Sequence, residues 1–314
     1  MAKTSAAPKN FYTASQATKR LGIPKTTFFH YVRTGKIRKV VPPGQVEGYY
    51  PKTDIDKMAK ERELFILEYA SEPSTFARAT EGEIRGIYDL CVSLFGVTGT
   101  PSYELMLAWQ RKNPLTYYIV KQEDIITGYI GFLYLNEETT RYIMSESVPG
   151  VPSPSETEVL PFTPGVPIDG LFLGLAVRPG LSLQHARSHG RHLMTGGVEV
   201  LENFARQGMP VKKLYATSRT PDGIKLCNKL GFREIIYPGD PIIRYELDVE
   251  KSDSPLLEDY RQILARANHH RVQHDSKTDS RTERKPRTMV DTSGQNGTGP
   301  KAPSRSGSHS TRTK

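Results

Sequence analysis

Apolar and polar residues follow one another in patterns that predict strands and helices along the chain. The clearest pattern is Leu171–Val177, an unbroken run of apolar and glycine residues that predicts a buried strand. A turn at Arg178–Gly180 follows, and the mostly polar stretch Leu181–Gly190 predicts a loop. Apolar residues then recur at helical spacing over Arg191–Gln207, and Gly208 is a helix stop. We therefore predict a strand, a basic loop and a helix, in that order.

The residues on either side of this segment alternate between strand-like and helix-like patterns. Tyr117–Lys121 and Ile125–Tyr134 predict two strands, and their short polar link favours antiparallel pairing. Ser145–Asp169 is rich in proline and serine and predicts a surface insertion without regular structure. The predicted fold class is α/β, a mixed sheet with helices on both faces. The remaining predicted strands are Phe76–Ala79, Lys213–Thr217, Arg233–Tyr237 and Ile243–Val249, and the remaining helices are Glu81–Phe95, Glu104–Arg111 and Pro221–Leu230.

The N-terminal part of the chain predicts a smaller, basic unit built on two short helices. Thr13 is a candidate N-cap for the first helix, which ends at Gly22. The second helix is predicted over Lys25–Arg33. Two short helices joined by a tight turn are typical of a helix-turn-helix unit. The residues predicted to face inward on the second helix are Phe28, Phe29 and Val32.

A hairpin is predicted after the second helix. Lys36–Val41 is a basic, strand-like run, and Gly48–Pro51 returns after a proline-containing turn. Thr53 is the candidate cap of a further helix, which we expect to continue through Ala59–Tyr69. We predict disorder at residues 1–10, the helix-turn-helix unit at 11–60, a connecting helix at 61–73 and the sheet domain at 74–250. A short helix at Leu256–Ala267 and a disordered tail complete residues 251–314.

Composition narrows the class of partner. The chain has 314 residues, a net charge of +9 and an isoelectric point near 9.3, which favours a polyanionic partner. The basic tail either adds non-specific affinity for nucleic acid or only solubilises the protein. With two cysteines the sequence offers neither a disulfide framework nor metal-ligand spacing, so we expect no metal. We expect a cytoplasmic protein with no membrane contact, because no apolar run is long enough for a span.

The N-terminal unit resembles the MerR/excisionase type of winged helix-turn-helix domain. The resemblance rests on Tyr12–Ala17 with Leu21–Ile23, on Tyr31 followed by Gly35–Ile37, and on Tyr50–Ile55. It implies binding to double-stranded DNA, with the second helix in the major groove, and it raises the expectation of a homodimer. The cations expected to neutralise phosphates are Lys25, Arg33, Lys36, Arg38 and Lys39, and the residues expected near base edges are Thr26, Thr27 and His30. The alternative is a solvated basic face that docks another protein.

The second half resembles the GNAT-type N-acetyltransferases. Arg187-x-x-Gly190-x-His192 follows a strand that ends in Val177-x-Pro179, and Leu226–Phe232 resembles the family's Leu-Tyr-x-Lys-x-Gly-Phe signature. The resemblance implies transfer of an acyl group from acetyl-CoA, or another acyl-CoA, to an amine. It implies that the backbone of Leu175, Ala176 and Val177 binds the pantetheine arm, and that Arg187, Ser188, His189, Gly190, Arg191 and His192 hold the diphosphate.

The sequence departs from that family at the positions that carry the chemistry. His192 replaces the last small residue of the loop, and Cys227 stands where a tyrosine usually donates a proton to the thiolate. Cys227 is therefore either that donor or a packed core residue. Asp169 is one candidate general base, and His185 and His189 are others. Two functions remain open: an N-acyltransferase joined to a DNA-binding unit, or a transcription regulator whose second domain senses acyl-CoA or dimerises.

Overall fold

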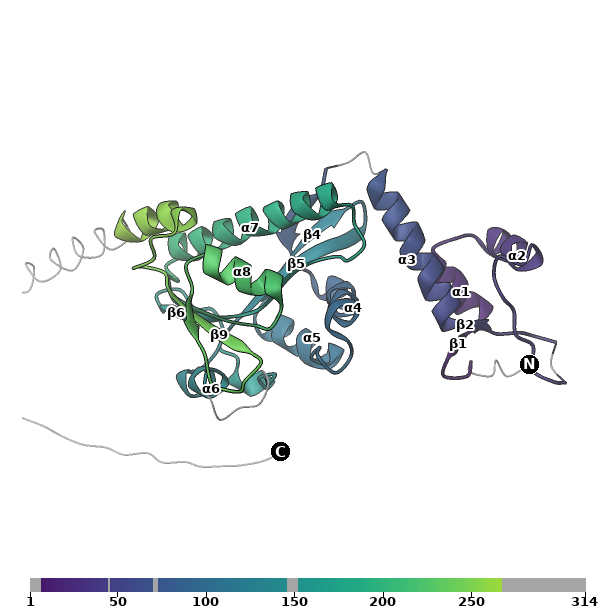
Figure 1. Ribbon diagram of the computed structural model, residues 1–314, viewed down its shortest axis with the longest axis horizontal. Helices are drawn as coiled ribbons and strands as arrows, with labels where there is room; N and C mark the ends of the chain where they lie inside the picture. Colours follow the sequence, from purple (N-terminus) through teal and green to yellow (C-terminus); the bar gives the residue numbers. More distant parts are fainter. Residues whose placement is uncertain (1–6, 45, 70–72, 146–151, 267–314) are drawn as a thin grey trace, which may run out of the picture. The chain divides into compact units, whose positions relative to one another are not determined.

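A computed structural model describes residues 7–44, 46–69, 73–145 and 152–266 (Figure 1). The predicted disorder of the N-terminal segment concerns residues that lie mostly outside these ranges, and the predicted tail at 267–314 lies outside them entirely. A 3₁₀ turn, Pro255–Leu257, and helical residues 258–266 form the last described segment. The Tyr260 hydroxyl of that segment donates to the Val211 carbonyl at 2.8 Å, which ties the segment to the sheet.

A mixed seven-stranded sheet organises the C-terminal part of the described chain. Its strand order is β3-β4-β5-β6-β7-β9-β8. Strands β6 and β7 run parallel, whereas the other neighbouring pairs are antiparallel. The predicted antiparallel pairing of β4 and β5 is therefore confirmed. The strands are β3 Thr75–Arg78, β4 Tyr117–Gln122, β5 Ile125–Tyr134, β6 Ile168–Val177, β7 Val211–Ser218, β8 Arg233–Ile235 and β9 Ile243–Asp248.

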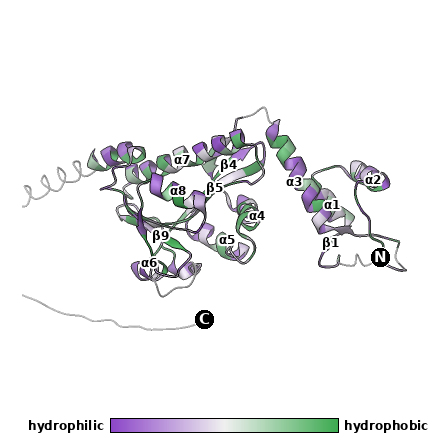
Figure 2. Cartoon of the chain, in the orientation of Figure 1, coloured by the Kyte–Doolittle hydropathy of each residue, from purple (hydrophilic) through white to green (hydrophobic). Residues whose placement is uncertain are grey.

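Helices cover both faces of this sheet, as the alternating pattern predicted (Figure 1). Helices α4 (Ile84–Phe95) and α5 (Tyr103–Lys112) pack on one face around the buried Trp109. Helices α7 (Leu183–Arg206) and α8 (Pro221–Lys229) pack on the other face. Figure 2 shows hydrophobic and hydrophilic residues interspersed along α7, as expected of a helix with one side on a core. A further helix, α6 (Glu137–Ile143), was not predicted.

Glycines let α7 approach the sheet closely. A Cβ atom built on Gly196 would lie 2.5 Å from the ring of Phe76 on β3. On β5, a Cβ atom at Gly128 would lie 2.8 Å from Leu193. Larger side chains at these two positions would therefore push the helix away from the strands. The close approach positions α7 over β3 and β5.

The proline-rich segment after α6 contains more structure than the sequence predicted. Its described part includes a 3₁₀ turn at Glu156–Glu158, and Val159 is fully buried. The indole N–H of Trp109 donates to the Pro154 carbonyl at 3.1 Å. The prediction of a surface insertion without regular structure was therefore wrong for this part, because a buried tryptophan needs a hydrogen-bond acceptor there.

Three described helices form the N-terminal unit: α1 (Ala14–Leu21), α2 (Lys25–Arg33) and α3 (Lys52–Glu68). The predicted bounds of α2 are confirmed, and Thr13 caps α1 through a reciprocal pair of hydrogen bonds with Gln16. A small core holds the three helices together, and its fully or almost fully buried members include Ala17, Phe28, Ile55 and Ala59.

The hairpin predicted after α2 differs from the structure. Its two arms share a single described bridge, between Val40 and Tyr49. The return residues form β2 (Tyr50–Pro51), which pairs with β1 (Phe11–Tyr12) instead. Helix α3 begins at Lys52 with Pro51 at its N-cap, so Thr53 is not the cap, and the helix runs unbroken to Glu68. Strand β1 was not predicted, because a two-residue strand has no measurable periodicity.

Candidate functional site

Strand β6 has paired neighbours on both sides only at Gly170 and Leu171. Parallel pairing with β7 covers Ile168–Leu171, whereas antiparallel pairing with β5 continues to Val177. Leu173 has no partner on β5, and a bulge of this kind bends and twists its strand. One backbone edge of residues 172–177 therefore has no strand partner among the described residues. Such an edge can bond an extended chain that carries amide groups.

The residues predicted to bind the pantetheine arm lie on this open half of β6. Leu175 pairs with Ile130, Ala176 with Tyr129, and Val177 with Gly128, all on the β5 side. The side chain of Ala176 is buried. The opposite backbone edge of these three residues faces away from β5, which is the arrangement the prediction requires.

Helix α7 begins in the turn that leaves β6. Ser182 is its N-cap, and the Ser182 hydroxyl accepts a hydrogen bond from the His185 N–H at 3.4 Å. The Ala186 N–H donates to the Ser182 carbonyl at 2.9 Å. The N–H groups of Leu183 and Gln184, in the first turn, have no acceptor within the helix. Because the helix dipole is positive at this end, the two amides suit an anionic group.

The predicted start of this helix was wrong by eight residues. The helix begins at Leu183 and not at Arg191, so the predicted loop Leu181–Gly190 is mostly helical. The backbone N–H groups of residues 188–192 lie beyond the first turn, where helical hydrogen bonds already use them. They are therefore not the free donors that the resemblance implied. The members of the predicted set with exposed side chains are Arg187, Ser188 and Arg191.

The histidines of α7 point toward protein groups. His189 is 2% exposed, and its Nε2 lies 3.2 Å from the Gln122 side-chain oxygen on β4. Burial lowers the pKa of His189 to about 4, with a smaller contribution from His185 and His192. The ring nitrogen Nδ1 of His192 lies 2.7 Å from the Ser74 hydroxyl. His189 is thus a neutral core residue, which does not suit it to the role of an accessible base.

Asp169 lies in the half of β6 that pairs with β7, opposite Lys213. Partial burial raises the pKa of Asp169, and the neighbouring Lys213 opposes that rise. A raised carboxyl pKa is what a general base near neutral pH needs. The open half of the strand begins three residues later. Asp169 as base therefore stays a prediction.

Cys227 lies in the core between α8 and the sheet. Its side chain belongs to the cluster that contains Phe232 and Tyr245, and burial raises the pKa of its thiol to about 11. A thiol that is packed among apolar side chains fits the structural alternative for this residue better than the donor role.

Exposed polar and cationic residues gather on one side of α2. Thr26, His30 and Arg33 follow one another at helical spacing and are exposed, whereas Phe28 is buried. Phe29, predicted to face inward, is 45% exposed and shares the side of Thr26 and Arg33. The other predicted contacts are the exposed Lys25, Lys36, Arg38 and Lys39 and the half-buried Thr27. Arg38 also lies 3.3 Å from the Asp54 carboxylate.

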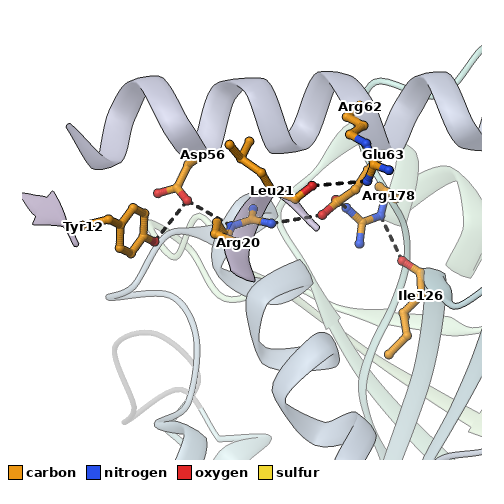
Figure 3. A network of polar contacts seen from close by, with 8 residues as sticks. All are labelled: Tyr12, Arg20, Leu21, Asp56, Arg62, Glu63, Ile126 and Arg178. Atoms are coloured by element: carbon orange, nitrogen blue, oxygen red, sulfur yellow. Dashed lines mark hydrogen bonds and ion pairs between the residues drawn. The ribbon is translucent and has the colours of Figure 1, made fainter. Parts of the chain in front are cut away.

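Sequence patterns did not reveal Arg178, which follows β6 directly. Its guanidinium donates to the Ile126 carbonyl at 2.9 Å and to the Glu63 carboxylate of α3 at 2.8 Å (Figure 3). Ser182 was missed as well, although a serine before an apolar residue at a helix start is a recognised signal. The basic residues and Gly190 that follow Ser182 favour a loop by composition, and this pattern masked the helix start.

Other features of the described residues point to no second site. One shallow hollow lies beside α6 and includes Thr139 and Tyr142, and another lies between α8 and β9 and includes Asn228 and Lys251. Neither hollow includes a residue of the open half of β6. Within the described ranges, His, Cys, Asp and Glu side chains form no group suited to a metal ion. None of the described helices is both long and apolar enough to span a bilayer.

Comparison with known proteins gives likenesses of fold only. Neither a family model nor a curated protein matches this sequence. The GNATL loading domain of CurA from Lyngbya majuscula is 14% identical, covers 58% of this chain and all 100% of its own, and has a TM-score of 0.41. The protein yncA from Salmonella typhimurium, solved with its cofactor acetyl-CoA, is 14% identical over 59% of this chain and 98% of its own, with a TM-score of 0.37.

A third similar structure is Arabidopsis thaliana Naa50, solved with the bisubstrate analogue CoA-Ac-MVNAL. It is 14% identical over 56% of this chain and 98% of its own, with a TM-score of 0.36. At such identities and TM-scores, these likenesses concern the fold and do not extend to the site of this chain.

Proposed function

We propose that the sheet domain binds an acyl-CoA along the open half of β6 and transfers its acyl group to an amine. The observation that carries the proposal is that β6 stops pairing with β7 after Leu171 and has a bulge at Leu173. The pantetheine arm carries two amides and would pair with the free edge of Leu175–Val177, as an added strand does. The diphosphate would then reach the free N–H groups of Leu183 and Gln184 at the start of α7.

The chemistry is direct acyl transfer. The amine nitrogen attacks the thioester carbonyl carbon, a carbon–nitrogen bond forms, and the carbon–sulfur bond breaks. A base removes one proton from the amine nitrogen, and the departing thiolate takes up a proton. The chain needs to position the two reactants and to supply the base. Asp169 is the base candidate that we retain, since partial burial raises the pKa of its carboxyl group.

We further propose that the N-terminal unit binds double-stranded DNA through α2. The side of α2 that carries Thr26, His30 and Arg33 would enter the major groove. Phe29 on the same side offers an apolar contact for a thymine methyl group. Arg33, at the end of that side, would contact a phosphate, as would Lys25, Lys36 and Lys39, so affinity would depend on salt concentration.

A second function follows from the position of Cys227. If its buried thiol cannot protonate the departing thiolate, the domain could bind acyl-CoA without turnover and serve as a sensor for a DNA-binding regulator. Binding and turnover therefore have to be measured separately.

The experiment is a thermal unfolding titration of the full chain with acetyl-CoA, followed by a turnover assay with a panel of amines. Specific binding to the folded state raises the apparent stability by about 2.7 kcal/mol when the ligand is at a hundredfold excess over Kd. Binding with turnover supports the acyltransferase, and binding without turnover supports the sensor. An unfolding temperature that does not change with acetyl-CoA would overturn both.

A further inference from the structure

Helix α3 contacts residues 178–185 at three points; this segment, which we call the 178–185 turn, comprises the turn after β6 and the first three residues of α7. The Glu63 carboxylate accepts from the Arg178 guanidinium at 2.8 Å (Figure 3). A Cβ atom built on Gly180 would lie 3.0 Å from the Leu64 side chain, so Leu64 packs directly on this glycine. The Glu68 carboxylate lies 3.2 Å from His185 Nδ1. We call these contacts the α3 latch.

The residues of the latch share one face of α3. Leu64 and Glu68 are one helical turn apart, and Glu63 and Leu67 stand beside them. Leu67 is fully buried. The side chains of Arg178 and Glu63 are 19% and 27% exposed, so solvent screens this ion pair less than the exposed pairs of α3. The ion pair between Arg178 and Glu63 therefore has a defined geometry when formed, and it can also be broken.

The residues that α3 contacts flank, along the chain, the amides to which we assign the coenzyme diphosphate. Arg178 precedes the N–H groups of Leu183 and Gln184, and His185 follows them. Coenzyme A carries a diphosphate and, in its nucleotide, a further phosphate. Glu63 and Glu68 therefore place negative charge where the coenzyme would bring more, and they occupy side chains that could otherwise pair with phosphate.

Glu63 also connects the turn to the helices of the N-terminal unit. Its second carboxylate oxygen accepts from Arg20 of α1 at 3.1 Å. Arg20 donates to Asp56 at 3.0 Å, and the Tyr12 hydroxyl of β1 donates to the same Asp56 oxygen at 3.1 Å. The chain of contacts in Figure 3 thus runs from the start of the proposed coenzyme site to α1, the neighbour of α2.

We propose that acyl-CoA and the carboxylates of α3 compete for the 178–185 turn, so that coenzyme binding opens the latch and alters DNA binding. This inference rests on the proposed function of both sites. The protein then has a latched state, in which Glu63 pairs with Arg178, and an open state, which the coenzyme favours. If the coenzyme changes the affinity for DNA by some factor, DNA changes the affinity for the coenzyme by the same factor.

The test compares the full-length protein with Glu63→Gln, which keeps the shape of the side chain and removes its charge. Glu61→Gln is the matched control, because Glu61 is an exposed glutamate on the same helix whose described ion pair, with Lys57, is at 4.0 Å. Affinity for acetyl-CoA is measured by calorimetry, and affinity for a short DNA duplex of mixed sequence by fluorescence anisotropy, with and without acetyl-CoA. All measurements use one ionic strength, since both affinities vary with salt.

We expect Glu63→Gln to bind acetyl-CoA about fivefold more tightly than the wild type, which is the lower range of measured coupling between sites. We expect acetyl-CoA to change the DNA affinity of the wild type by a similar factor and that of Glu63→Gln much less. Glu61→Gln should match the wild type in both assays. Acetyl-pantetheine, which lacks the nucleotide phosphates, should bind all three proteins alike.

Three results decide against the inference, and they are distinguishable. Coenzyme binding that is equal or weaker in Glu63→Gln would overturn the competition, while leaving the proposed coenzyme site intact. Tighter binding without any effect of acetyl-CoA on DNA affinity would overturn the coupling to DNA. Absence of acetyl-CoA binding in every protein would overturn the proposed function and this inference together. Glu68→Gln provides a second variant if thermal unfolding shows that Glu63→Gln is poorly folded.

Discussion

Two regions of this molecule are proposed to meet phosphate groups, and their cationic side chains differ in what they contact. On and after α2, Lys25, Arg33 and Lys36 are exposed, and the ammonium group of Lys36 lies 5.2 Å from the ring of Tyr31. At the 178–185 turn, Arg178 is largely buried and its guanidinium bonds a carboxylate and a carbonyl. The first region presents charged side chains to solvent. The second presents backbone amides, and its Arg178 already bonds other groups of the protein.

This difference indicates two kinds of recognition. Exposed lysines and arginines attract any polyanion and release counterions, so they give affinity with little geometric demand. Backbone amides at a helix start are fixed in space and accept an anion only in one position. The first arrangement suits a long, regular phosphate backbone, and the second suits one small ligand. Each prediction below removes a group from one region and leaves the other unchanged.

The largest effect is expected from Leu183→Pro at the start of α7. Proline is well tolerated at the first helical position, and Ser182 already has the extended backbone (φ −59°, ψ 154°) that a residue before proline requires. The substitution removes one free N–H without breaking a helical hydrogen bond. We expect affinity for acetyl-CoA to fall by about thirtyfold, the value of one hydrogen bond to a charged group, in a calorimetric titration.

Leu183→Ala is the control for that experiment. It removes the exposed side chain and keeps the N–H group, so acetyl-CoA should bind as it does to the wild type. An equal decrease of affinity in both variants would indicate a side-chain contact and would remove the amide from the proposed site. DNA binding should be unchanged in both.

A smaller effect is expected from removing two cations in the first region. Arg33→Ala combined with Lys36→Ala should weaken binding to a DNA duplex by about tenfold near physiological salt. The slope of log affinity against log salt should become shallower by about 1 for each phosphate that the variant no longer neutralises. Fluorescence anisotropy over a range of salt concentrations measures both quantities.

Arg141→Ala is the matched control, because Arg141 is an exposed arginine on α6 of the sheet domain. It should leave both the affinity and the salt dependence unaltered. A salt slope that is the same in the double variant and the wild type would mean that Arg33 and Lys36 do not contact phosphates. Acetyl-CoA affinity should be insensitive to all of these changes.

The smallest effect concerns stability and pH in the helix that carries the second region. Burial lowers the pKa of His189 to about 4 in the folded chain, below its ordinary value near 6.5. The unfolded chain therefore binds a proton more readily, and this contribution to stability is complete above about pH 6.5 and is lost as the pH falls toward 4. We expect a decrease on the order of 1 kcal/mol in the free energy of unfolding between about pH 7 and pH 5.

Urea unfolding of the wild type and of His189→Gln at these two pH values measures the effect. The variant should lose less stability on acidification than the wild type, because it has no ring to protonate at this position. His30→Gln, which changes an exposed histidine on α2, is the control. An identical pH dependence in all three proteins would contradict the lowered pKa of His189.

Some parts of the fold could be predicted because local patterns determine them. The bounds of α2 and of β5 match the prediction, since glycine, proline or short polar links punctuate both elements. The mixed sheet with helices on both faces followed from the alternation of strand-like and helix-like segments. The predicted partners of the pantetheine arm lie on the strand half that the structure leaves open.

Other parts could not be predicted because they depend on contacts between distant residues. Gly190 and its basic neighbours have the composition of a loop, yet packing on the sheet keeps them in α7, where His189 contacts Gln122. The pairing of β6 with β7 ends just before the bulge at Leu173, and a bulge has no clear sequence signature. The contact between Glu63 and Arg178 joins residues that are 115 positions apart. A single sequence holds no information about such pairs beyond their charges.

The unbroken course of α3 has a mechanical consequence. Asp56, which bonds Arg20 of α1, and Glu68, which meets His185, lie on one continuous helix. At a rise of about 1.5 Å per residue, they are separated by about 18 Å along its axis. A tilt of about 10° at one end would move the other by about 3 Å, close to the ~3.4 Å rise of one base pair. A small adjustment beside the proposed coenzyme site would therefore move the end of α3 that contacts α1 by a distance comparable to one base-pair step of the proposed DNA ligand.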